Sequence, residues 1–171
     1  VTQPEFERIV VFQVENRGEG YKLLLELFSR GNIILTDAED KILQALEQRR
    51  MRDRSVVRGE RLKPPPPSGL NPLRMTLRDM EMLRRSGDQA VRVIARQFGL
   101  GGLYAEESLS AAGVPRDTPS NRLTDQQLDD ILRAITSLTS RLTENRLDPC
   151  IVVSPEGQWL DALPFRLSVY K

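Results

Sequence analysis

Three glycines, Gly99, Gly101 and Gly102, stand between two segments with a helical pattern of apolar residues. Glycine is favoured where the backbone needs a positive φ or where another group comes close to it. A glycine-rich turn that opens a helix leaves N–H groups uncovered, and these groups can bind a phosphate at the positive end of the helix dipole. The alternative interpretation is a tight helix–helix turn without a ligand.

A second candidate for phosphate chemistry is the arginine-rich segment 49–63. It carries seven basic residues against two acidic ones, whereas the whole chain is nearly neutral, with 25 basic and 24 acidic residues. Arginine pairs bidentately with phosphate, and contacts to the backbone give affinity for a nucleic acid without reading its sequence. The candidate contacts are Arg49, Arg50, Arg52, Arg54 and Arg58. A solvated loop is the alternative.

Residues suited to catalysis are scarce in this sequence. The chain has no histidine and a single cysteine, Cys150, so it lacks the commonest general base and cannot form an internal disulfide. The adjacent acidic pairs at 106–107 and 129–130 fall on predicted helices, where neighbouring side chains point about 100° apart. We therefore expect a module that is not an enzyme and that has no metal site and no cofactor.

The elements that must position these residues begin with a predicted antiparallel meander. Its strands are expected at 6–15, 21–28, 33–36 and 41–47, joined by short turns, although 41–47 also has good helix propensity. The first strand is almost continuously apolar at its centre, which is typical of a strand covered on both faces. The prolines at 64–67 form a rigid spacer, so we place a domain boundary after residue 67.

After residue 75 the apolar period becomes helical. Capping boxes that begin at Thr76, Ser86 and Thr124 predict three helix starts, and a further helix is expected at 103–112, closed by Gly113. Two runs at 151–153 and 158–163 predict a β hairpin, with another possible strand at 165–170. The fold class is therefore α+β, with domains at 1–67, 68–147 and 148–171.

The glycine turn and the helix after it resemble the helix-two-turns-helix domain of formamidopyrimidine-DNA glycosylases. The matching residues are Gly99, Leu100, Gly101, Tyr104, Glu107, Ala112 and Gly113. In that family an asparagine helps the turn to hold DNA phosphates, and this chain has Gly102 at that position. The glycosylase nucleophile is an N-terminal proline, whereas Pro4 is internal here, and the family's zinc finger would need cysteines that this chain lacks. The matching residues make a DNA-binding or DNA-repair module the alternative function, and the departures make it the less favoured one.

A second resemblance spans the whole chain. The segment Leu25-Glu-Leu-Phe-Ser-Arg-Gly-Asn-Ile-Ile-Leu-Thr-Asp37 is similar to the signature of the NFACT family. Segment 6–12 resembles that family's F-D-R strand, with Glu7 in place of aspartate, and 58–66 resembles its G-x-x-Y-x-x-P-P passage, with Leu62 in place of the aromatic residue. The family's amino-terminal domain is related to the glycosylase architecture, so one family accounts for both signals.

The resemblance implies a cytoplasmic part in ribosome-associated quality control. Members of the family bind a stalled large ribosomal subunit and tRNA, and many promote template-free extension of the nascent chain. The family's Asp-Arg pair, which is linked to tRNA handling, corresponds to Glu7 and Arg8, and Arg30 and Asn32 are further candidate contacts in the signature. A fibronectin-binding adhesin is a second alternative, because bacterial homologues carry that name. We expect the chain to be a piece of a longer polypeptide.

Overall fold

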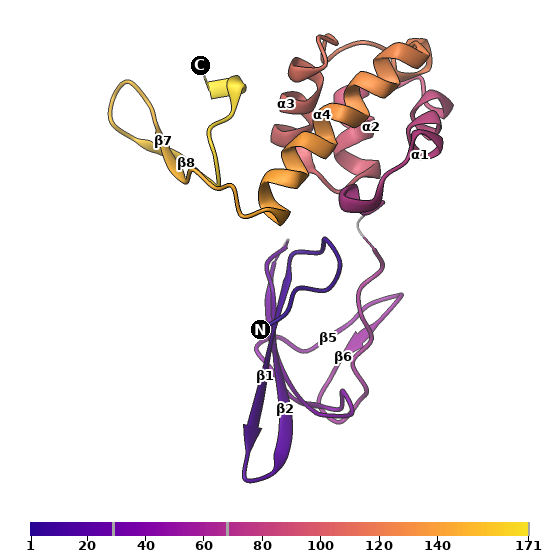
Figure 1. The fold of residues 1–171 in the computed structure, drawn as a ribbon. Helices are drawn as coiled ribbons and strands as arrows, with labels where there is room; N and C mark the ends of the chain where they lie inside the picture. Colours follow the sequence, from indigo (N-terminus) through magenta and orange to yellow (C-terminus); the bar gives the residue numbers. More distant parts are fainter. Residues whose placement is uncertain (29, 68, 171) are drawn as a thin grey trace. The chain divides into compact units, whose positions relative to one another are not determined.

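The computed structural model of the protein describes residues 1–28, 30–67 and 69–170. The chain forms two compact units, Val1–Pro67 and Ser68–Lys171. Figure 1 shows strands in the first unit, and helices followed by a hairpin in the second. The predicted α+β class is confirmed. The division into three domains stays a prediction.

The first unit is built on an antiparallel sheet. Its strands lie in the order β1 (Ile9–Asn16), β2 (Glu19–Glu26), β3 (Asn32–Asp37) and β4 (Ile42–Ala45). Segment 41–47 therefore contributes a strand, as expected of a continuing meander. The turn between β1 and β2 has two residues, Arg17 and Gly18, with φ of 53° and 82°. Two positive φ angles match the right-handed twist of a hairpin, so this turn sets the register of the two strands.

The arginine-rich segment follows the sheet and folds back on one of its faces. It contains two short paired strands, β5 (Arg49–Arg50) and β6 (Ser55–Val56). The buried cluster of this unit consists of Ile34, Ile42, Ala45 and Val56. Because Val56 packs against residues of β3 and β4, the segment is part of the folded unit and not a loose loop.

The second unit is mainly helical. Its helices are α1 (Leu77–Glu81), α2 (Ala90–Gln97), α3 (Gly101–Ala111) and α4 (Asp125–Thr143), with short 3₁₀ turns η1 (Pro72–Arg74), η2 (Met82–Arg85) and η3 (Ser120–Arg122). The capping boxes at Thr76 and Thr124 are confirmed, because in each the side chain and the backbone exchange hydrogen bonds with the third residue of the helix. These reciprocal bonds satisfy N–H groups that would otherwise lack a partner.

The capping box predicted at Ser86 is wrong. The helix α2 begins at Ala90, four residues after Ser86, and its N-cap Gln89 makes no side-chain capping bond. The Ser86 hydroxyl accepts a hydrogen bond from the Asp88 N–H, 3.1 Å away, and so stabilises a turn before the helix. The Ala90 N–H instead donates to the carbonyl of Thr118, so a distant loop satisfies the helix start.

The helical core contains residues from all four helices and the loops between them. Its largest fully buried side chains are Phe98, Met80, Leu83, Ile94, Leu109, Ile131 and Ile135. Helix α4 supplies Leu128, Ile131 and Ile135, which form an apolar stripe at helical spacing. The stripe thus packs a core, as a stripe at helical spacing usually does.

A β hairpin and a final turn complete the second unit. The hairpin pairs β7 (Cys150–Val153) with β8 (Trp159–Leu163), as predicted. The strand predicted at 165–170 is wrong, because the chain ends in a 3₁₀ turn, η4 (Ser168–Tyr170). The carboxylate of Glu107 accepts hydrogen bonds from the backbone N–H groups of Ser168 (2.9 Å) and Val169 (3.1 Å), which stabilises the start of this turn.

Candidate nucleic-acid interface

The glycine turn joins α2 to α3 and leaves the start of α3 bare. Gly99 and Gly101 have φ of 62° and 73°, a region that other residues rarely adopt. The N-cap residue Leu100 makes no side-chain capping bond, and the first turn of α3 contains no acidic residue. Gly99, Gly101 and Gly102 are all exposed. Among the described residues, no side chain is therefore recorded as capping the first N–H groups of α3, which leaves them available to a phosphate.

Gly69 supports this turn, and the sequence analysis missed it. The N–H of Leu70 donates to the carbonyl oxygen of Gln97 at 2.6 Å. A Cβ atom at Gly69 would lie 2.6 Å from that same oxygen and 2.8 Å from the N atom of Gly99. Only glycine allows the two backbones to come this close. In the sequence, Gly69 follows the proline run, where it indicates a domain boundary and not a close backbone contact.

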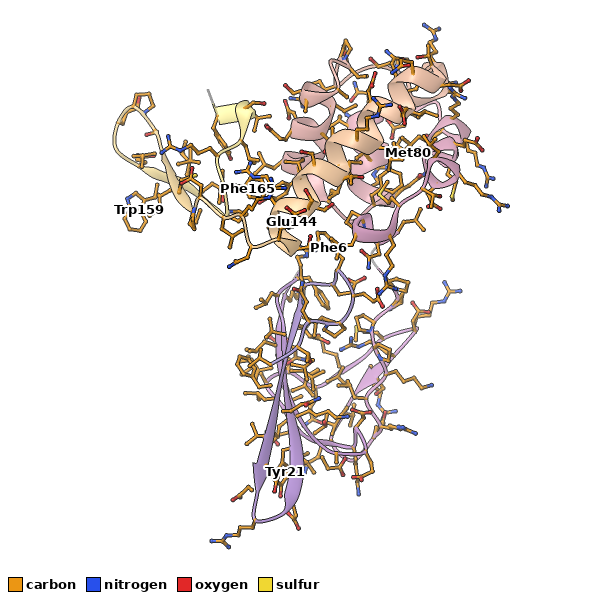
Figure 2. The ribbon with its side chains drawn as sticks, in the orientation of Figure 1. Phe6, Tyr21, Met80, Glu144, Trp159 and Phe165 are labelled. Atoms are coloured by element: carbon orange, nitrogen blue, oxygen red, sulfur yellow. The ribbon has the colours of Figure 1, made fainter. Side chains whose placement is uncertain are left out.

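The other residues that match the glycosylase motif have structural roles. The Glu107 side chain is buried and binds η4, and its second oxygen also accepts from the Ser168 hydroxyl at 2.9 Å. Tyr104 packs edge-on against Phe165, which is labelled in Figure 2, with ring centroids 6.5 Å apart. Burial raises the pKa of the Tyr104 hydroxyl, and the nearby Asp161 carboxylate raises that pKa further. Tyr104 therefore stays neutral and acts in packing.

Arg54 lies in the interior of the first unit, although the sequence predicted it as a phosphate contact. Its side chain is 4% exposed, and its Nη2 atom lies 2.5 Å from Oε1 of Glu26, which is also buried. This ion pair joins β2 to the arginine-rich segment. The Arg54 Nε atom has no hydrogen-bond partner among the described residues. The sequence signal for Glu26 was a lone carboxylate inside an apolar strand, since buried charges need a partner.

Asn32 is also an internal residue. Its side-chain nitrogen donates to the carbonyl of Glu47 at 2.9 Å, and its side-chain oxygen accepts from the N–H groups of Glu47 (3.1 Å) and Ile33 (3.0 Å). Its side chain is thus occupied in holding the start of β3 to the chain after β4. Asn32 supports the architecture of the signature.

The remaining candidate residues of the first unit are at or near its surface. Arg49 is half-buried and pairs with Glu47, while Arg50 pairs with Glu60 at 3.0 Å with its side chain 76% exposed. Four others are exposed and have no ion pair among the described residues: Arg8, Arg30, Arg52 and Arg58. Glu7 is half-buried and has a partner. Most of the predicted arginines can therefore meet a ligand.

One pocket brings the signature and the arginine-rich segment together. It has a volume of about 200 Å³ and is lined by the basic residues Arg30, Arg49 and Arg54 and the acidic residues Glu26 and Asp53. Its remaining lining residues are Phe28, Gly31, Asn32, Met51, Val56, Pro65 and Pro66. The structure thus unites predicted residues from two separate motifs at one site. The predicted residues Glu7, Arg8, Arg50, Arg52 and Arg58 lie outside its lining.

Within residues 1–28, 30–67 and 69–170, no group of three or more His, Cys, Asp or Glu side chains is placed to hold a metal ion. No helix in the same ranges has the length and apolar character needed to cross a membrane.

Comparison with known proteins relates the chain to longer proteins. The chain is 35% identical over 178 residues to the archaeal Rqc2 homolog aRqcH of Methanocaldococcus jannaschii, and the match covers the whole chain but 26% of that relative. Two solved structures share the fold over 98% of the chain. They are the N-terminal part of the fibronectin/fibrinogen-binding protein of Streptococcus suis (TM-score 0.64, 22% identity, 58% of that chain) and the fibrinogen-binding protein of Staphylococcus aureus (TM-score 0.69, 20% identity, 61% of that chain).

The family assignment covers the full sequence. Residues 1–171 match the family described as NFACT N-terminal and middle domains. The signature, the pocket beneath it and the glycine turn all fall inside the matched residues. The chain therefore belongs to the NFACT family.

Proposed function

We propose that this chain is an RNA-binding module of a ribosome-associated quality control factor. In this proposal it contacts tRNA and ribosomal RNA on the stalled large ribosomal subunit, in the cytoplasm, and does not itself catalyse a reaction. The longer protein uses that contact to promote template-free extension of the nascent chain. Membership of the NFACT family and the 35% identity to an Rqc2 homolog support the proposal.

The observation that carries the proposal is the pocket between the signature and the arginine-rich segment. Two of its three arginines, Arg30 and Arg49, suit a phosphate, because guanidinium groups pair with phosphate oxygens. Its apolar lining, which includes Phe28, Met51 and Pro65, suits the flat face of an unstacked base. A site with both features fits a single-stranded nucleotide of a folded RNA.

The structure changes the set of residues that we assign to RNA contact. Arg54 is paired with Glu26 in the interior, and the Asn32 side chain is bonded to the backbone, so we propose that both residues hold the pocket in shape. The proposed direct contacts in the first unit are Arg8, Arg30, Arg49, Arg50, Arg52 and Arg58. The bare start of α3 is a further phosphate contact, on the second unit.

The proposal is tested by the salt dependence of ribosome binding. We expect the full-length protein to co-sediment with large ribosomal subunits, with an affinity that falls as salt rises, because phosphate contacts release counterions. The double variant Arg30→Gln/Arg49→Gln removes two phosphate partners and should bind more weakly, with a shallower salt dependence. The control is Arg17→Gln, which removes one exposed charge from the far β1–β2 turn. Wild-type binding by the double variant, or equal loss in the control, would refute the proposal.

Binding to duplex DNA is a second candidate, supported by the exposed glycine turn at the start of α3. It predicts that a DNA duplex competes with tRNA for the protein and that Gly102→Asp, which places a negative charge at that helix start, abolishes the competition. For the fibronectin-binding alternative, we identify no supporting surface feature among the described residues. The two solved structures of fibronectin- or fibrinogen-binding proteins are 20–22% identical to the chain and share its fold.

A further inference from the structure

The β7–β8 hairpin of the second unit has apolar residues on both of its faces, and its inner face packs against the helices. Leu163 is buried on that inner face, and Cys150 and Val152 pack against the same buried cluster. Helix α3 contributes Tyr104 to this packing, and helix α4 contributes Leu138. The inner face is therefore covered by the chain itself.

The outer face is made by the alternate residues of the two strands. One cross-strand pair is Ile151 with Ala162, and the next is Val153 with Trp159. Because side chains alternate along a strand and paired residues share a side, these two pairs lie together. All four residues are exposed, as is Leu160 at the irregularity in the pairing. Figure 2 shows Trp159 projecting from the hairpin away from the helices.

The apolar side chains of the outer face are open to solvent. Ile151 is 53% exposed, Val153 48%, Leu160 57% and Trp159 79%. In the part of the chain that the structure describes, none of the four belongs to a buried cluster. Tryptophan buries a large apolar area on binding and is enriched among the residues that dominate binding energies. A group of exposed apolar side chains around a tryptophan therefore indicates a protein-docking surface.

The charge of the hairpin selects the kind of partner. Residues 147–163 contain three acidic residues, Asp148, Glu156 and Asp161, and no basic residue, whereas the whole chain is nearly neutral. Arg166, the first cation after the hairpin, has its Nε atom 3.3 Å from Oδ2 of Asp148. A nucleic acid needs cations around an exposed aromatic side chain. The acidic border instead suits a protein whose apolar groove is flanked by lysine and arginine.

We propose that the outer face of the hairpin docks on a basic protein of the large ribosomal subunit, with Trp159 in an apolar groove of that protein. Proteins that bind ribosomal RNA carry basic surfaces, because they neutralise phosphates. Such a surface complements the acidic border of the hairpin. This inference rests on the proposed function, which brings the chain to the large subunit, and it adds a protein contact to the RNA contacts.

Site-specific photocrosslinking tests the inference. In the full-length protein, photoreactive p-benzoylphenylalanine replaces Trp159, and its complex with purified large ribosomal subunits is irradiated after co-sedimentation. The control carries the same amino acid in place of Arg133, an exposed residue of α4. We expect position 159 to crosslink to a basic ribosomal protein and position 133 to give no crosslink to that protein.

Binding measurements with two further pairs of variants complete the test. We expect Trp159→Ala to weaken binding to the large subunit about tenfold, because it removes the central anchor. Leu142→Ala, which removes another exposed apolar side chain of the second unit, should bind as the wild type does. Glu156→Lys should weaken binding more at low salt than at high salt, because salt screens the repulsion from a basic partner. Asp117→Lys, in an exposed loop, is its control.

The outcomes separate this inference from the proposed function. Failure of the wild-type protein to co-sediment with large subunits would overturn both. Co-sedimentation with a crosslink from position 159 to ribosomal RNA, to the protein's own chain or to nothing would overturn this inference alone. Unchanged binding of Trp159→Ala would also overturn it, and thermal unfolding of each variant shows that the fold is intact.

Discussion

At the scale of single residues, the role of each arginine in segment 49–63 depends on how deeply its side chain is buried, and not on its charge alone. The sequence presents Arg49, Arg50, Arg52, Arg54 and Arg58 as equivalent cations, and the structure separates them. Arg54 is enclosed with Glu26, whereas Arg50 stands 76% exposed beside Glu60. Removing one partner of a buried ion pair leaves an unpaired buried charge and costs much stability. An exposed ion pair stabilises the fold little, because solvent screens its charges.

This contrast predicts unequal effects of two matched substitutions. Arg54→Met leaves the Glu26 carboxylate buried without a partner, and we expect it to lower the free energy of unfolding by about 3–5 kcal/mol. Arg50→Met breaks an exposed pair and should cost less than about 1 kcal/mol. Urea unfolding of the 171-residue chain measures both. The double variant Glu26→Leu/Arg54→Met should recover most of the loss, and a loss below 1 kcal/mol for Arg54→Met alone would contradict this role.

At the scale of elements, the glycine turn depends on a residue from outside it. Gly69 packs its backbone against Gln97 and Gly99, whereas a Cβ at Gly102 would meet no atom of the described residues within 4 Å. Gly69, outside the turn, is therefore required by close packing, whereas Gly102, within the turn, leaves the surface open. The first serves the fold and the second leaves room for a ligand.

The two glycines should respond differently to alanine. Gly69→Ala forces a methyl group into backbone atoms, so we expect a loss of about 1–3 kcal/mol in the free energy of unfolding. Gly102→Ala lies in the first turn of α3 without a positive φ, and should stabilise the chain by about 0.4–1 kcal/mol. Thermal and urea unfolding of the two variants check the signs. Equal effects would contradict the assigned roles.

The elements also show what sequence patterns can and cannot predict. The meander, the hairpin and the capping boxes at Thr76 and Thr124 were predictable, because their signals lie within a few residues of one another. The failures at Ser86 and at 165–170 have distant causes. The carbonyl of Thr118 satisfies the start of α2, and Glu107 stabilises the final turn. Local sequence patterns could not predict the burial of Arg54 and Asn32 either, because their partners lie 28 and 15 residues away in the sequence.

At the scale of the whole molecule, each unit presents a feature that it does not use internally. The first has the pocket lined by Arg30 and Arg49, and the second has the start of α3, where the N-cap residue makes no side-chain capping bond. The hairpin adds Trp159, which is 79% exposed and points away from the helices in Figure 2. The chain spans about a quarter of the curated relative that it matches. These open surfaces are consistent with a module that works within a larger assembly.

The most direct test of the central claim is ultraviolet crosslinking of the full-length protein bound to stalled large ribosomal subunits, followed by identification of the crosslinked peptides and RNA. The account predicts crosslinks from tRNA or ribosomal RNA to peptides that contain Arg30 or residues 49–58, and their loss in the Arg30→Gln/Arg49→Gln variant. Robust RNA crosslinks elsewhere in the protein, with none in residues 1–67, would contradict it.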